Sequence, residues 1–198
     1  MVNEHKIGKT IDLQILNNFV NLEDQEKFIS MMSDLDELNK LDQTRDGRKI
    51  SVNPSELEIK YFIKKYSNKI IEMFPHLYIH QVLVGKYGIG SYMDVHRDSD
   101  SYDECQDCEV TAVVYFNNEY TGGEIYFPKI NKEYLPDAGS AVMFGIHDLD
   151  YDHGVKPIES GIKYAMPMCF TNNKKYLNKE YEWNSVLNKF KMTNWIMI

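Results

Sequence analysis

The chain has 198 residues, 43% of them hydrophobic, and a formal net charge of −8 at pH 7. This length and composition predict one folded domain with a buried core, and they argue against a disordered chain. The negative charge argues against a nucleic-acid partner, whose phosphate backbone requires a basic surface. The first residues lack the apolar core of a signal peptide, and no apolar run has the length of a membrane span. We therefore expect a cytoplasmic protein without a membrane partner.

The N-terminal part predicts a short strand followed by two amphipathic helices. Residues 10–20 mix β-branched and apolar side chains, as in a strand. Asn21, with Asp24 three positions later, is suited to cap the first helix, and Pro75 ends the second. The polar segment 42–53 between the helices predicts a loop that flanks the site. Apolar residues recur at helical spacing and predict the buried faces: Phe28, Met31, Met32, Leu35 and Leu38, then Ile59, Phe62, Ile63, Tyr66, Ile70, Met73 and Phe74.

From Leu77 onward, the pattern changes to short alternating strands. Turn-forming Gly and Pro residues separate them, with no helical pattern in between. Such a series predicts a sandwich or a jelly-roll barrel, with the two helices packed on one face, which is an α+β fold. The expected strands are residues 78–87, 110–117, 124–127, 140–146 and 163–171.

We expect these segments to form a single domain of 198 residues. Residues 1–76 would be a helical support region, residues 77–171 the barrel, and residues 172–198 a C-terminal extension. The extension contains Trp183 and Trp195, which suggest that it docks onto the domain. The abundance of Asn, Ile and Lys is typical of an AT-rich viral or bacterial genome.

One short motif carries the main chemical signal. His96 and Asp98 are two residues apart, and alternate residues of an extended segment point to the same side. An imidazole and a carboxylate can then bind one metal ion together, and one more histidine would complete the facial triad of non-haem Fe(II) oxygenases. By itself, the His-x-Asp pair is a weak signal that a surface segment would also produce.

The second half of the chain offers two further histidines, His147 and His153. A turn after His153 would bring Lys163 back beside the metal on the next strand. A lysine inside a barrel is costly without a partner, and an anionic co-substrate would be one. The alternative is that Lys163 is an ordinary exposed lysine.

Three cysteines are present, and two of them form the C-x-x-C motif Cys105–Cys108. A zinc site would need a second pair of ligands at similar spacing, and the sequence has none. The motif lies in an acidic segment instead of at the start of a helix, where a redox motif is expected. We interpret Cys105, Cys108 and Cys169 as reduced thiols without a special role.

The stretch from about residue 78 to residue 170 resembles the Fe(II)/2-oxoglutarate-dependent dioxygenases, above all their prolyl 4-hydroxylase-like branch. Single matches are unspecific, but they occur together in the order that the family shows. They are Tyr87 with the following glycines, His96-x-Asp98, Tyr115-Phe116-Asn117, Gly122-Gly123-Glu124 with Phe127-Pro128, Pro136 with Gly139, His153-Gly154-Val155 with Pro157, and Gly161-x-Lys163-Tyr164.

The resemblance implies a double-stranded β-helix with iron held by His96, Asp98 and His153. It also implies that Lys163 binds the far carboxylate of 2-oxoglutarate, and that Tyr87 and Tyr115 donate hydrogen bonds to it. Thr111 shares a face with Tyr115 in a regular strand and would line the same pocket. The implied activity is hydroxylation of an unactivated C–H bond with O2, with succinate and CO2 as co-products. Ascorbate is an expected additional requirement.

Some positions depart from the prolyl 4-hydroxylase pattern. Met93 stands where many of these enzymes have an aromatic residue, with Tyr92 one place earlier, and Tyr164 stands where tryptophan is common. We expect a prolyl or other side chain of a peptide or protein as the substrate, with a free amino acid or small metabolite as the alternative. Two other classes remain open. They are a non-catalytic barrel that binds a metal or ligand, and a jelly-roll metal enzyme without 2-oxoglutarate.

Overall fold

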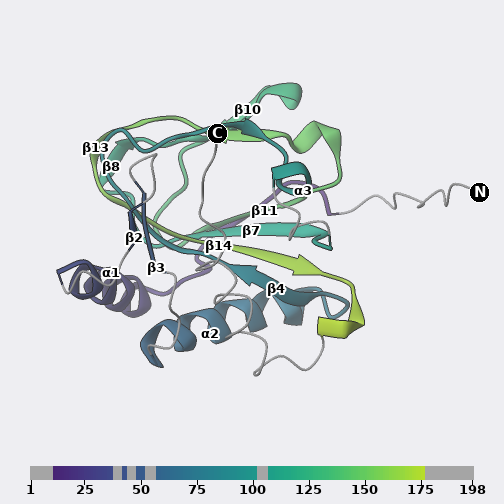
Figure 1. The fold of residues 1–198 in the computed structure, drawn as a ribbon, viewed down its shortest axis with the longest axis horizontal. Helices are drawn as coiled ribbons and strands as arrows, with labels where there is room; N and C mark the ends of the chain where they lie inside the picture. The colour runs from purple at the N-terminus through teal and green to yellow at the C-terminus, as the bar shows by residue number, and fades with distance from the viewer. Residues whose placement is uncertain (1–10, 38–41, 44–47, 52–56, 102–106, 177–198) are drawn as a thin grey trace, which may run out of the picture.

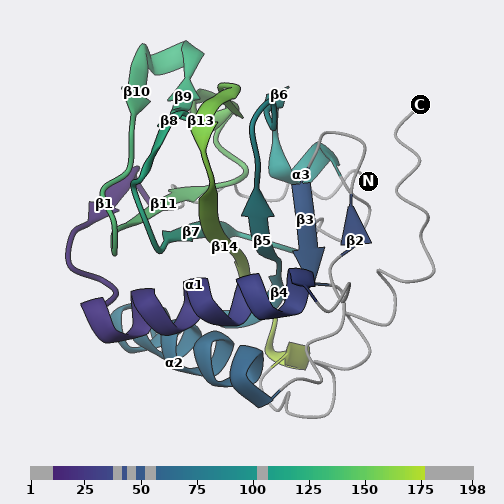
Figure 2. The same ribbon diagram turned by 90° about the vertical axis from the view of Figure 1, so that its left-hand side faces the viewer.

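The computed structural model describes residues 11–37, 42–43, 48–51, 57–101 and 107–176. In this part of the chain, two long helices lie side by side beneath a set of antiparallel strands (Figures 1 and 2). The α+β fold expected from the sequence is confirmed. None of the helices in the described part is long and apolar enough to cross a membrane.

The first helix, α1, spans Leu22–Glu37, and the second, α2, spans Leu57–Met73. Asn21 caps α1 as predicted, because its side-chain oxygen accepts a hydrogen bond of 2.8 Å from the backbone N–H of Asp24. The predicted apolar faces are buried at Phe28, Met31, Met32, Ile59, Phe62, Ile63, Tyr66 and Ile70.

One residue of these predicted faces is exposed. Met73, the last residue of α2, is 46% exposed, contrary to the prediction. Phe74 and Leu77, just after the helix, pack against the core at this end instead. The predicted burial of the Leu35 side chain and of Leu38 falls outside what the structure describes.

The larger sheet has eight strands and carries the helices on its outer face (Figure 2). Its strand order is β1-β11-β7-β14-β5-β3-β2, with β4 also paired to β14, and every pair is antiparallel. The strands are β1 (Gln14–Leu16), β2 (Asp42–Gln43), β3 (Arg48–Ser51), β4 (Tyr78–Val82), β5 (Val84–Tyr87), β7 (Val110–Tyr115), β11 (Ala141–Gly145) and β14 (Lys163–Thr171).

Two differences from the sequence prediction lie in this sheet. The strand predicted for residues 78–87 is divided at Leu83, whose N–H bonds to the carbonyl oxygen of Pro167 on β14. Proline has no N–H, so the ladder loses a rung there. The segment 42–53 was predicted to be a loop, but residues 42–43 and 48–51 form β2 and β3. A polar sequence can form a strand at a sheet edge, because one side of such a strand faces water.

The smaller sheets lie on the side away from the helices (Figures 1 and 2). One has four strands in the order β10-β9-β12-β6, and the other pairs β8 with β13. These strands are β6 (Met93–His96), β8 (Tyr120–Gly122), β9 (Ile125–Phe127), β10 (Lys132–Tyr134), β12 (His153–Val155) and β13 (Ile158–Gly161). Of these, only β9 was predicted from the sequence.

Two clusters of buried apolar residues hold these layers together. One lies between the helices and the larger sheet and includes Phe28, Tyr66 and Phe116. The other includes Tyr115, Phe127, Phe144 and Ile158, contributed by both the larger and the smaller sheets, and it lies beside the site described next. Residues 102–106 and 177–198, which contain Cys105, most of the second predicted polar loop (99–109) and both tryptophans, lie outside the described residues. The predicted single domain, with its three regions, stays a prediction.

Candidate metal centre

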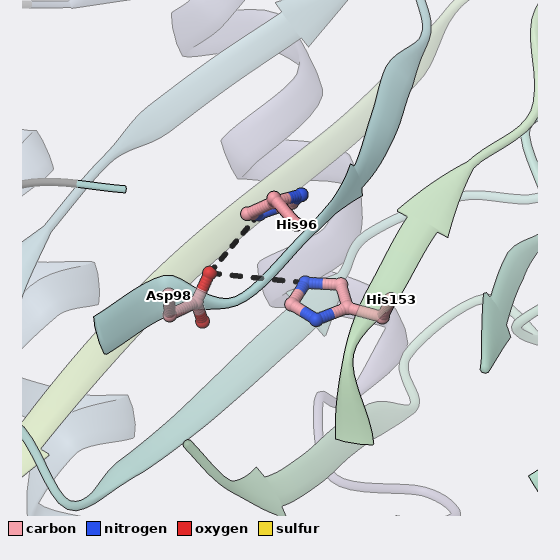
Figure 3. Close-up of side chains that lie close together, drawn as sticks. All are labelled: His96, Asp98 and His153. Atoms are coloured by element: carbon pink, nitrogen blue, oxygen red, sulfur yellow. Dashed lines mark hydrogen bonds and ion pairs between the residues drawn. The ribbon is translucent and has the colours of Figure 1, made fainter. Parts of the chain in front are cut away.

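Three side chains from three segments meet on one side of the smaller sheet (Figure 3). His96 ends β6, Asp98 begins the short helix α3 (Asp98–Ser101), and His153 begins β12. His96 and His153 are directly paired across the sheet, and their ring centroids are 4.5 Å apart. One possible ligand atom from each residue lies within 4.8 Å of the other two. We call these three residues the candidate metal centre.

The second ring nitrogens show which tautomer each histidine adopts. His96 Nδ1 lies 2.9 Å from the carbonyl oxygen of Asp94, and His153 Nδ1 lies 3.2 Å from that of Tyr151. A carbonyl oxygen can only accept, so each Nδ1 carries the proton and each neutral ring keeps a lone pair on Nε2. Both Nε2 atoms face Asp98 Oδ1, at 3.1 Å from His96 and 3.8 Å from His153.

The electrostatic environment favours the protonation states that bind a metal. Burial alone would raise the pKa of Asp98, but hydrogen bonds from His96 and Thr111 and the charges of both histidines lower it below the usual value. Burial lowers the pKa of His153, and this outweighs the opposing effect of Asp98. At neutral pH the cluster therefore has an ionised carboxylate and a neutral His153.

Thr111 lies against this carboxylate. Its hydroxyl donates to Asp98 Oδ2 at 2.5 Å, while Nε2 of His96 lies near the other carboxylate oxygen. Thr111 lines the cavity, as the sequence predicted. Its printed contact is with the carboxylate of Asp98, so its hydroxyl is placed to hold that carboxylate in one orientation.

Lys163, the first residue of β14, lies opposite Tyr87 in the larger sheet. Its residue exposure is 4%, which excludes an ordinary exposed lysine. The ammonium group donates to the carbonyl oxygen of Gly123 at 3.1 Å. It also lies 5.5 to 6.0 Å from the ring centroids of Tyr87, Tyr115 and Tyr120, within the range of cation–π attraction.

These groups share one cavity of about 120 Å³. Its polar lining includes His96, Asp98, His153, Lys163, Thr111, Tyr87, Tyr115 and Ser91, and much of the rest is apolar, such as Met93, Val113, Val155 and Ile158. The Ser91 hydroxyl is buried and has no hydrogen-bond partner within the described part of the chain. The cavity thus combines a possible metal centre, a buried cation and an apolar wall.

The predicted site residues therefore lie together, whereas His147 is not a member of the cluster. Tyr92 and Met93, which depart from the prolyl 4-hydroxylase pattern, both line the cavity. The sequence analysis missed Tyr120, the third ring beside Lys163. It also missed the ion pair between Arg97 and Asp152, each of which is adjacent to a candidate ligand. The alternation of residues 96–98 was a signal that Arg97 points away from the cavity, but its partner depends on strand register.

Comparison with known proteins agrees with this geometry. Residues 81–171 match the sequence family described as the 2OG-Fe(II) oxygenase superfamily. A protein of Acanthamoeba polyphaga mimivirus, named "Putative prolyl 4-hydroxylase", is 29% identical over 108 residues. That match covers 46% of this chain and 44% of the mimivirus protein, so the chain spans less than half the length of this curated relative.

Solved structures share the fold. A viral collagen prolyl hydroxylase from Paramecium Bursaria Chlorella virus-1, in complex with 2OG, superposes with a TM-score of 0.62 at 20% identity, covering 81% of this chain and 96% of that one. A prolyl-4-hydroxylase from Pseudomonas putida gives a TM-score of 0.63 at 17% identity, with 81% and 92% covered. The fold is thus the expected double-stranded β-helix. Residues 81–171 form a domain of the 2OG-Fe(II) oxygenase superfamily, in its prolyl 4-hydroxylase-like branch.

Proposed function

We propose that this chain is an Fe(II)- and 2-oxoglutarate-dependent dioxygenase of the prolyl 4-hydroxylase type. It would hydroxylate an unactivated C–H bond of a peptide or protein and release succinate and CO2. The observation that carries this proposal is the meeting of two imidazoles, one carboxylate and a buried lysine in a single cavity.

The candidate metal centre fits Fe(II) in its donor chemistry. His96, Asp98 and His153 would supply two neutral nitrogens and one oxygen, the set that leaves coordination positions open in non-haem iron oxygenases. Both histidines already have Nδ1 bonded to a carbonyl oxygen and Nε2 directed at the common point. Iron with bound 2-oxoglutarate supplies the O2 activation and the oxidising power, and the protein supplies position and exclusion of water.

Lys163 would bind the far carboxylate of 2-oxoglutarate. Its ammonium group is buried in the same cavity as the metal centre, where Coulomb attraction to an anion is stronger than in water. Tyr87 and Tyr115 line the cavity beside it. Burial raises the pKa of Tyr115, so its hydroxyl keeps the proton that a carboxylate would accept. Thr111 would act on Asp98, not on the co-substrate.

A prolyl side chain in a peptide is the proposed substrate. The largely apolar wall of the cavity suits a pyrrolidine ring, which has no hydrogen-bond donor to satisfy. The name of the mimivirus relative supports the same choice. A free amino acid or small metabolite is the alternative, because Met93 replaces an aromatic residue that is common in the branch. We expect ascorbate to sustain turnover.

The test begins without O2. Fe(II) and then 2-oxoglutarate are added to metal-free protein, and the weak visible charge-transfer band of the chelate is recorded for the parent, His153→Ala and His147→Ala. We expect the band in the parent and in His147→Ala only. O2 is then admitted and succinate is measured with and without prolyl peptides. Bound iron without a band would contradict 2-oxoglutarate chelation, and a band in His153→Ala but not in His147→Ala would contradict the ligand assignment.

A further inference from the structure

The backbone pairing between the two strands that carry the histidines ends at the candidate metal centre. In the register of β6 with β12, His96 pairs with His153, and Val155 pairs with Met93 across an irregularity. Beyond the histidines, the chain enters α3 on one side and comes from a 3-10 helix, Leu149–Tyr151, on the other. The two segments therefore have no further backbone ladder at the point where the ligands must stay close together.

A side-chain pair occupies the next position of this register. Arg97 follows His96, and Asp152 precedes His153. Arg97 Nε donates to Asp152 Oδ1 at 2.8 Å, and Arg97 Nη2 donates to Asp152 Oδ2 at 3.2 Å. Two parallel hydrogen bonds between a guanidinium and a carboxylate fix relative orientation as well as distance. Neither residue lines the cavity, in contrast to His96, Asp98 and His153.

The pair is shielded from water and is ionised. The Arg97 side chain is 21% exposed and the Asp152 side chain 16%. Burial by itself raises the pKa of Asp152, but hydrogen bonds from Arg97 and Lys129 lower it below the usual value. Lys129 Nζ lies 2.7 Å from Asp152 Oδ2, and its side chain is 44% exposed. Lys129 belongs to a third segment, the 3-10 helix Pro128–Ile130, and carries no candidate ligand.

We propose that the Arg97–Asp152 ion pair is a positioning clamp that holds the two ligand-bearing segments together at the metal centre. This inference rests on the proposed function. Arg97 lies between two ligands and Asp152 is adjacent to the third, so a shift at the pair moves all three. The clamp acts through its neighbours and touches neither metal nor substrate. Its main consequence is therefore on metal affinity and coordination geometry.

The test uses Co(II), whose visible d–d spectrum reports ligand geometry without turnover. Arg97→Gln and Asp152→Asn each remove the ion pair while keeping a side chain of similar size. We expect a roughly tenfold to hundredfold loss of Co(II) affinity in both, as for other groups that orient metal ligands, with a changed d–d spectrum. Arg97→Lys, which retains the charge but loses the two-point geometry, should recover only part of the affinity.

Lys129→Gln is the matched control, because it removes a cation from the same carboxylate without touching a ligand-bearing segment. We expect its affinity and spectrum to match the parent. Thermal unfolding of each metal-free variant separates general stability from positioning. The clamp is refuted if Arg97→Gln binds Co(II) with the parent's affinity and spectrum, whatever its melting temperature, or if Lys129→Gln is equally impaired. A parent that binds neither Co(II) nor Fe(II) overturns the proposed function together with the clamp.

Discussion

Lys163 and the candidate metal centre lie in one cavity, so a ligand with a chelating end and a far carboxylate could contact both. Lys163 is buried, and its ammonium group already donates to a backbone carbonyl oxygen. Its charge is thus held at a fixed place by the fold. An anion that binds there gains from a cation that is desolvated before the ligand arrives.

Replacing Lys163 should separate the dioxygenase from the other barrel proteins considered above. We expect Lys163→Ala to weaken 2-oxoglutarate binding by at least roughly 30-fold, because loss of one partner of a buried charge pair costs about 2 kcal/mol or more. Fe(II) affinity should change little. Isothermal titration of the anaerobic Fe(II) protein with 2-oxoglutarate measures the effect.

Lys86→Ala is a suitable control for this experiment. Lys86 neighbours Tyr87 on β5, but its ammonium group bonds to Asp36 of α1, on the helix side of the sheet, at 2.8 Å. The control should bind 2-oxoglutarate as the parent does. Unchanged 2-oxoglutarate affinity in Lys163→Ala would remove the role assigned to Lys163 and favour a non-catalytic barrel or a different metal enzyme.

Among the secondary-structure elements, α1 and α2 are joined through a buried carboxylate. Asp24, in the first turn of α1, accepts hydrogen bonds from Tyr66 and Lys65 of α2, with Lys65 Nζ at 2.6 Å. Asp24 is almost completely buried. Burial by itself raises its pKa, but these two partners lower it below the usual 3.8. The carboxylate thereby fixes the helix pair beneath the larger sheet.

Asp24→Asn should lower the free energy of unfolding at pH 7 by about 1–3 kcal/mol, because a buried charge-assisted network loses its charge. A carboxyl group whose pKa is lower in the folded state stabilises the fold above its unfolded-state pKa, and this contribution is lost as pH falls through the folded-state pKa. The difference between parent and variant should therefore shrink in acid. Urea unfolding at pH 7 and at successively lower pH measures it.

Glu23→Gln is the control for the helix pair. It alters the neighbouring residue, whose ion pair with Lys27 is exposed to solvent, so we expect little change in stability. If Asp24→Asn loses as much stability at low pH as at pH 7, the stabilisation does not come from the ionised carboxylate.

The predictability of the elements follows their length. The two helices and the strands β7, β11 and β14 were found because five or more residues show a clear period. Strands of three or four residues, such as β6 and β12, are too short to show alternation. Yet these two carry His96 and His153.

The site shows the same limit. His96 and Asp98 are visible as a local motif, whereas the choice of His153 over His147 came from the resemblance to a family. The pairing of Arg97 with Asp152 depends on register between residues 55 positions apart, which no local pattern contains.

On the scale of the whole molecule, metal binding and folding stability are coupled. A ligand that binds only the folded state stabilises it, by about 2.7 kcal/mol at a free concentration of 100 times Kd. The candidate metal centre joins β6, α3 and β12, so a bound ion links segments that are distant in the sequence. Fe(II) or Co(II) should raise the melting temperature, and a chelator should reverse the increase.

The size of this increase should depend on pH with a definite sign. The metal binds neutral imidazole and ionised carboxylate, so protons compete with it. Burial keeps the pKa of His153 below its ordinary value of 6.5, so this ligand needs no deprotonation at pH 7. As pH falls through that pKa, protonation of His153 opposes metal binding. The metal-induced increase should therefore be largest at neutral pH and decline below about pH 6.5. Calorimetry with Co(II) across this range measures it, and His153→Ala should show almost no increase at any pH. An increase that persists unchanged in acid would place the bound ion at groups other than His153.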